Sequence, residues 1–91
     1  MKKKDFRFGE ITEIFDEEEY SNGFRKTKFL LKTFGNYSQE LLFELHREKA
    51  DYITSYEVGD VIRVFFDIKG NQGTDGKYYT NLIAWCLEYA G

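Results

Sequence analysis

Three lysines, Lys26, Lys28 and Lys32, occupy even positions of a segment whose odd positions include Phe29 and Leu31. This alternation is typical of a half-buried strand, in which the lysines share the solvent-facing side and each two-residue step covers about 7 Å. That step is near the spacing of phosphates in a nucleic acid strand, where bound cations release counterions. The same lysines could equally keep a sheet soluble and protect a strand edge.

Flat side chains on which bases stack would complete this chemistry, each contributing about 1–3 kcal/mol. Phe65 is the most suggestive, because Val64 and Phe66 already supply the inner face of its strand and Arg63 stands beside it. Phe24, His46 and Tyr79 lie at strand ends or on outer positions. The predicted nucleic-acid-binding residues are therefore Phe24, Lys26, Lys28, Lys32, His46, Arg63, Phe65, Lys77 and Tyr79.

An apolar stripe on the last predicted strand supports a competing interpretation. Ile83, Trp85 and Leu87 occupy its odd positions, opposite the predicted core face. Contiguous exposed apolar surface commonly marks association between chains. We therefore predict an oligomer interface at these three residues, and Phe65 fits this interface as well as it fits base stacking.

No motif in the sequence predicts catalysis, a metal or a cofactor. Cys86 is the only cysteine, so we expect it to be a small buried hydrophobe rather than a disulfide partner or metal ligand. His46 has no cluster of cysteines, histidines or carboxylates to complete a metal site. The glycines at 70–76 lack the strand, helix and Gly-Lys-Ser/Thr ending of a P-loop. We expect a non-enzymatic protein.

Length and composition predict one small domain. The chain has 91 residues, of which 19% are aromatic, and we expect a single domain over 1–91 with a flexible basic arm at 1–5. No apolar run approaches a membrane span or a signal peptide, which favours a soluble, cytoplasmic protein. The net charge is −3, but it is segregated: positive charge gathers at 2–7 and 25–32 and negative charge at 16–19.

The elements that must position these residues can be followed along the chain. Strands are predicted over 6–15 (bent at Gly9), from Arg25, over 39–46, over 61–69 and over 77–89, with an acidic loop at 16–23 and a long hairpin tip at 70–76. Between the third and fourth strands, 47–56 places Ala50, Ile53 and Tyr56 three apart on one helical stripe. This order is that of an all-β, five-stranded OB-fold barrel with one short helix between strands three and four.

Several blocks of the chain resemble bacterial single-stranded DNA-binding proteins. They are 40–46, 59–64 and 75–85, the last containing Tyr78-Tyr79-Thr80 and Ala84-Trp85. The chain is still more similar to a family of small bacterial OB-fold domains of unknown function related to those proteins. The resemblance implies an OB fold and binding of single-stranded DNA or RNA.

Alternatives to nucleic-acid binding follow from the acidic residues. The chain could be a protein–protein interaction module that uses its apolar outer strand and the acidic loop at 16–19. The acidic loop could also mimic phosphates and occupy a DNA-binding protein. If the chain binds single-stranded nucleic acid, we expect a homo-oligomer; for the interaction module we leave the protein partner open.

Overall fold

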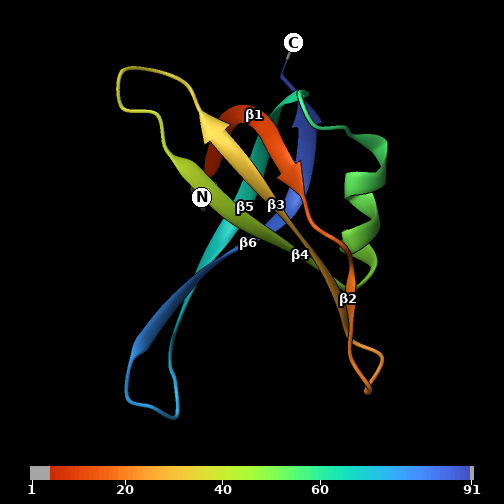
Figure 1. Cartoon of the computed structure of the whole chain (residues 1–91), viewed down its shortest axis with the longest axis vertical. Coiled ribbons are helices and arrows are strands. Elements are labelled where there is room, and N and C mark those ends of the chain that lie inside the picture. The colour runs from red at the N-terminus through yellow and green to blue at the C-terminus, as the bar shows by residue number, and fades with distance from the viewer. Residues whose placement is uncertain (1–4, 91) are drawn as a thin grey trace, which may run out of the picture.

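The computed structural model describes residues 5–90 and shows a closed ring of five strands (Figure 1). The strand order β1-β5-β6-β4-β3 returns to β1, and a short extra strand, β2, pairs with β3. Every pairing is antiparallel except that of β4 with β6. The elements are β1 (Phe6–Ile14), β2 (Glu18–Glu19), β3 (Arg25–Thr33), β4 (Glu40–His46), the helix η1 (Arg47–Ser55), β5 (Val61–Gln72) and β6 (Tyr78–Tyr89). The predicted OB-fold barrel is confirmed.

The core follows from the alternation of the strands. Apolar residues on alternate positions of β3, β4 and β5 point into the ring and are almost completely buried. The fully buried ones among the largest side chains are Ile11, Phe29, Leu31, Phe43, Leu45, Ile62 and Val64. Lys26, Lys28 and Lys32 lie on the outside of β3, as predicted, because their strand neighbours fill the interior.

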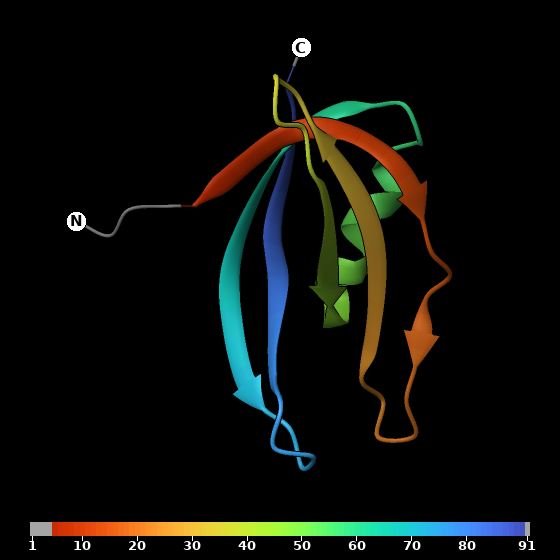
Figure 2. The ribbon, with the colours of Figure 1, turned by 60° about the vertical axis from the view of Figure 1, so that its left-hand side comes forward.

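Strand β1 closes the ring by pairing with β5 through its first half and β3 through its second half. Gly9 pairs on both sides, and a Cβ atom at this position would come within 2.4 Å of the carbonyl oxygen of Lys32. Only glycine permits so close an approach of two backbones, and the predicted bend at Gly9 is confirmed. β1 arches strongly over the end of the barrel in Figure 2.

The helix at 47–55 is a 3₁₀ helix whose inner stripe plugs the barrel. A 3₁₀ helix repeats every three residues, so Ala50 and Ile53 stand one above the other and are both buried. Tyr56, directly after the helix, packs against the same core and donates a hydrogen bond to the Leu87 carbonyl at 3.1 Å. The described part of the chain contains no helix that could span a membrane.

The main differences from the sequence predictions concern the acidic loop and the β5–β6 hairpin. The acidic loop contains β2, whose Glu18 and Glu19 pair with Lys26 and Arg25, so 16–24 forms a hairpin arm rather than a free loop. The β5–β6 hairpin is longer than predicted, because β5 continues to Gln72. Residues 1–4 of the predicted basic arm lie outside the described residues, whereas the Asp5 carbonyl accepts a hydrogen bond from the Phe66 amide at 3.1 Å.

A β-bulge at Trp85 removes Leu87 from the predicted outer stripe of β6, whereas Ile83 and Trp85 stay on the outer side. Phe65 pairs with Cys86 and Phe66 with Ala84, so Trp85 is an extra residue that shifts the alternation of the strand by one. Leu87 therefore shares the inner side with Val64 and packs against the core, instead of facing outward beside Trp85. Cys86, predicted to be buried, faces outward with Phe65 and is half-buried.

Candidate nucleic-acid interface

Three rings form a row across β2, β3 and β4, and we call Tyr20, Phe24 and His46 the ring row. The Tyr20 and Phe24 ring centroids are 5.7 Å apart, and those of Phe24 and His46 are 5.2 Å apart. The β3–β4 register creates the second contact, since Lys26 pairs with His46 and Phe24 stands two residues before Lys26, directly ahead of β3. Two predicted residues thus meet, and Tyr20, which the sequence did not single out, extends the row.

Two cations lie over the ring row. The Lys26 ammonium is 5.8 Å from the centre of the Tyr20 ring, and the Arg47 guanidinium is 5.5 Å from that of Phe24. Arg47 has a φ of 58°, a left-handed conformation that costs a residue with a side chain about 1–2 kcal/mol. Such strain concentrates at functional sites, and here it occurs at the junction of β4 and η1, beside the rings.

Acidic neighbours compensate most of the positive charge on β3. Lys26 lies 3.7 Å from Glu44 and Lys28 lies 3.6 Å from Glu18. Arg25 contacts Glu17 at 2.9 Å and binds Asp51 on η1 through two hydrogen bonds of 2.9 and 3.0 Å. Of the three predicted phosphate-binding lysines, Lys32 alone has no ion pair within residues 5–90.

Glu44 is a buried carboxylate in the middle of this surface. It lies on the outer side of β4, as predicted, but its side chain is only 8% exposed because its partners cover it. Asn81 donates a hydrogen bond to it at 2.6 Å, and His46 Nε2 approaches it at 2.8 Å. Burial alone would raise the pKa of Glu44, but these two bonds and the charge of Lys26 outweigh burial and hold that pKa below its usual value.

The β5–β6 hairpin carries the predicted Lys77 and Tyr79 beyond the barrel. Tyr79 donates a hydrogen bond to Asp75 at 2.6 Å, which lowers the pKa of Asp75 and raises that of Tyr79, while Tyr78 remains 79% exposed. Figure 2 shows this hairpin and the β2–β3 hairpin extending in the same direction on either side of β4. The β2–β3 hairpin therefore carries Tyr20 and Phe24 of the ring row on one side of β4, and the β5–β6 hairpin lies on the other side.

The remaining predicted residues, Arg63 and Phe65, lie on a different face. The Phe65 ring packs between those of Phe6 and Trp85, with centroid distances of 5.6 and 5.5 Å. Arg63 lies over Phe6 at 5.8 Å and contacts Glu88 at 3.3 Å. Because β5 pairs with neither β3 nor β4, the structure does not bring these residues to the ring row.

Sequence reasoning also missed Arg47. The sequence pattern marks Arg47 only as the first residue of the predicted helix, and its position over Phe24 depends on its left-handed backbone. Tyr20 lies in the predicted acidic loop, although the turn signal Ser21-Asn22-Gly23 beside it is typical of a hairpin that would bring Tyr20 next to the following strand. Within residues 5–90 no group of histidines, cysteines or carboxylates could hold a metal ion.

Solved structures similar to this chain are single-stranded DNA-binding proteins. A mitochondrial one from S. cerevisiae has a TM-score of 0.80 at 17% identity, covering 97% of this chain and 95% of that one. An SSB domain from Synechococcus has a TM-score of 0.73 at 9% identity, covering 98% and 97%. A deletion mutant of the single-stranded DNA binding protein from Thermus aquaticus has a TM-score of 0.72 at 19% identity, covering 92% of this chain and 38% of that one. These likenesses show the OB fold.

No curated protein matches this chain. Residues 8–88 match a family described as a domain of unknown function, DUF3127. That match includes all of β2–β5, η1 and most of β1 and β6. The chain therefore belongs to the DUF3127 family, whose fold here is that of single-stranded DNA-binding proteins.

Proposed function

We propose that this protein binds single-stranded nucleic acid, without catalysing a reaction on it, through the outer surface of β3 and β4 and the two hairpins that flank it. The observation that carries the proposal is the ring row with Lys26 and Arg47 over its rings. Sequence-neutral binding of single strands needs stacking rings beside cations, and OB folds bind strands on this face.

The cations without an ion pair in the described chain are the best candidates for phosphate contacts. Lys32 lies on β3, Arg47 and Lys49 on η1, and Lys69 and Lys77 on the β5–β6 hairpin, whereas Arg7 lies on the part of β1 that pairs with β5. Lys26 and Lys28 already neutralise Glu44 and Glu18, so they contribute less net attraction. We therefore expect modest affinity and a salt dependence that corresponds to a few phosphates.

Titration of a labelled thirty-base oligothymidine, followed by fluorescence anisotropy at several salt concentrations, tests the proposal. The affinity should fall with salt at a slope of about −0.7 per phosphate contacted. Tyr20→Ala and Phe24→Ala should each weaken binding by about 1–3 kcal/mol. Phe8→Ala is the matched control, since Phe8 on β1 is as exposed as Tyr20 (41% and 42%) but lies outside the ring row. Absence of binding at low salt would contradict the proposal.

A second function, association between copies of this chain, is favoured by the rings on the outer face of β1, β5 and β6. Phe6 is 47% exposed and packs against Phe65, which in turn packs against Trp85, so this face presents a row of adjoining, partly exposed rings. Phe6→Arg should lower the mass measured by light scattering, because a guanidinium is costly to bury in an apolar contact. A wild-type protein that is monomeric at high micromolar concentration would contradict this function.

A further inference from the structure

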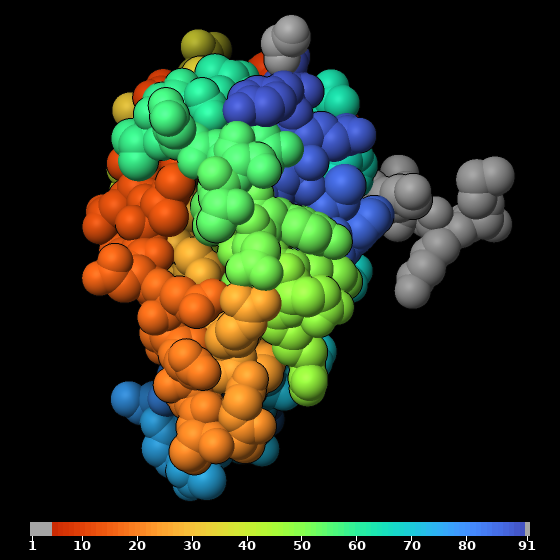
Figure 3. Space-filling model, turned by 90° about the vertical axis from the view of Figure 1, so that its right-hand side faces the viewer, coloured from red at the N-terminus to blue at the C-terminus, as the bar shows by residue number. Residues whose placement is uncertain are grey.

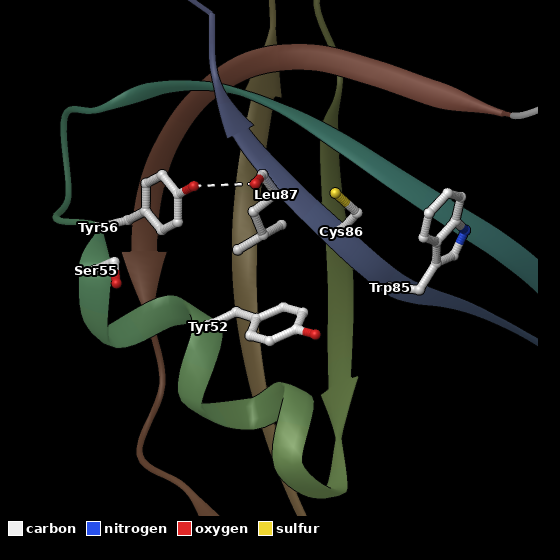
Figure 4. A pocket seen from close by; sticks show the side chains of 6 residues that line it. All are labelled: Tyr52, Ser55, Tyr56, Trp85, Cys86 and Leu87. Atoms are coloured by element: carbon white, nitrogen blue, oxygen red, sulfur yellow. Dashed lines mark hydrogen bonds between the residues drawn. The ribbon is translucent and has the colours of Figure 1, made fainter.

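A cavity of about 300 Å³ opens between η1 and β6, outside the ring row (Figure 4). Its walls are Tyr52, Ser55 and Tyr56 on one side and Trp85, Cys86 and Leu87 on the other. Two features of the backbone create it. β4 and β6 pair only at Phe43–Leu82 and Glu44–Ile83, so that the strands then diverge, and the bulge at Trp85 turns Cys86 outward.

The walls suit a flat ring with polar edges. Figure 4 shows the phenol of Tyr52 below Cys86 and the indole of Trp85 on the other side of the thiol. Ser55 and Tyr52 add hydroxyl groups that can donate or accept hydrogen bonds. The volume is at the lower end of the range for small-molecule sites, and apolar walls with a few polar groups are typical of such sites.

The helix connects this cavity to the ring row. In a 3₁₀ helix residues three apart eclipse one another, so Lys49, Tyr52 and Ser55 form one column with about 6 Å between neighbours. His46, at the other end of the column, directly precedes the helix and belongs to the ring row. Lys49 has no ion pair within residues 5–90. Figure 3 shows η1 between the β2–β3 arm and β6 on one face of the molecule.

The charges beyond the cavity limit what can enter it. Glu88 follows Leu87 on β6 and contacts Arg63 at 3.3 Å, while Tyr89 donates hydrogen bonds to the Ser55 carbonyl and, at 3.4 Å, to Asp60. The far end is therefore closed by the Tyr89 side chain, and the carboxylate of Asp60 behind it repels a phosphate, whereas Arg63 neutralises Glu88. The near end carries Lys49, where a phosphate can remain outside.

We propose that the cavity between η1 and β6 is a base-binding subsite, in which one base of a bound single strand leaves the ring row and inserts beside Tyr52 and Cys86. This inference rests on the proposed function, since the strand reaches the cavity from His46 along Lys49. The base occupies the cavity, and its phosphate lies against Lys49.

The only cysteine lines this cavity, so the rate of its alkylation reports whether the cavity is occupied. Iodoacetamide is uncharged, so the charge of a bound strand does not repel it. With saturating thirty-base oligothymidine, alkylation of Cys86, followed by mass spectrometry, should slow about tenfold, because the reagent reaches the thiol only in the unoccupied fraction. Tyr52→Ala should abolish this protection while the oligonucleotide still binds, and Tyr52→Phe should retain it.

Tyr52 is 42% exposed, so neither variant leaves a cavity in the core. Binding seen by anisotropy without protection of Cys86 would overturn the subsite and leave the proposed function intact. Protection that persists in Tyr52→Ala would also overturn it, since the thiol would then be covered by another surface. Absence of oligonucleotide binding to the wild-type protein would instead refute the proposed function, and the subsite with it.

Discussion

The ammonium group of Lys26 lies 3.7 Å from the buried carboxylate of Glu44, so a cation at the ring row is paired before any nucleic acid arrives. The two residues come from neighbouring strands, β3 and β4. A strand of phosphates must compete with Glu44 for Lys26 and also approach the negative charge of Glu44. The ion pair between Lys26 and Glu44 therefore limits the affinity of this surface for nucleic acid.

Glu44→Gln should increase oligonucleotide affinity. The amide keeps an oxygen that accepts the hydrogen bond of Asn81, but it removes the negative charge from beneath Lys26. Repulsion between this carboxylate and a solvent-exposed phosphate costs about 1 kcal/mol, so that its removal corresponds to a gain of about fivefold. Anisotropy titration at low salt measures the gain, and Asp67→Asn on exposed β5 is the control. An affinity that is unchanged or lower would refute the role of Glu44.

The same carboxylate should make stability depend on acid pH. The folded-state pKa of Glu44 is depressed, so its contribution is fully present above the unfolded pKa of about 4.3 and is lost as the pH falls through the folded value. Urea midpoints measured from neutral pH to about pH 3 should therefore fall more steeply for the wild type than for Glu44→Gln. Equal slopes would show that other carboxylates dominate acid unfolding.

Arg47 should separate stability from binding. Arg47→Gly relieves the left-handed strain and Arg47→Ala does not, so the glycine variant should be more stable than the alanine variant by about 1 kcal/mol. Both variants remove the guanidinium over Phe24 and should weaken oligonucleotide binding equally. Thermal melts and anisotropy titrations measure the two effects. Wild-type affinity in either variant would exclude Arg47 from the interface.

Phe66 should contribute mainly to the stability of the fold, and Phe65 mainly to association between chains. Phe66 is 3% exposed in the core, so Phe66→Ala should cost about 3–5 kcal/mol in free energy of unfolding. Phe65 packs between two outer rings, so Phe65→Ala should cost less, about 1–2 kcal/mol, and should lower the mass measured by light scattering. Similar losses of stability in both variants would place Phe65 in the core instead.

The alternation of apolar and polar residues was enough to predict the barrel, because each strand has one buried side. Lys28 and Phe29 on β3 and Val64 and Phe66 on β5 lie where that pattern places them. The bulge at Trp85 could not be predicted from this alternation, since in the apolar run 82–87 either the odd or the even positions could face the core. Only the pairing of β6 with Phe65 and Phe66 determines which side chains face inward.

The candidate interface was predicted less completely than the fold. Phe24, Lys26 and His46 were correctly expected on outer positions, and the β3–β4 register brings them together. Glu44 also lies on the outer side, but its burial depends on Asn81, which comes from β6 and is distant in sequence. Contacts of this kind require the register between strands, which a pattern within one strand does not contain.

Strand β1, which hydrogen-bonds along both edges, has a consequence for how the barrel opens. Gly9 and Glu10 pair with β3 on one side and with β5 on the other, although both partners are distant in sequence. Separating β1 from the ring therefore breaks its pairings with β3 and with β5 at the same time. Most native contacts of the β1 backbone form only when the whole chain has folded. The amides at this crossing should exchange with solvent only through global unfolding, while the two hairpin arms exchange by local opening.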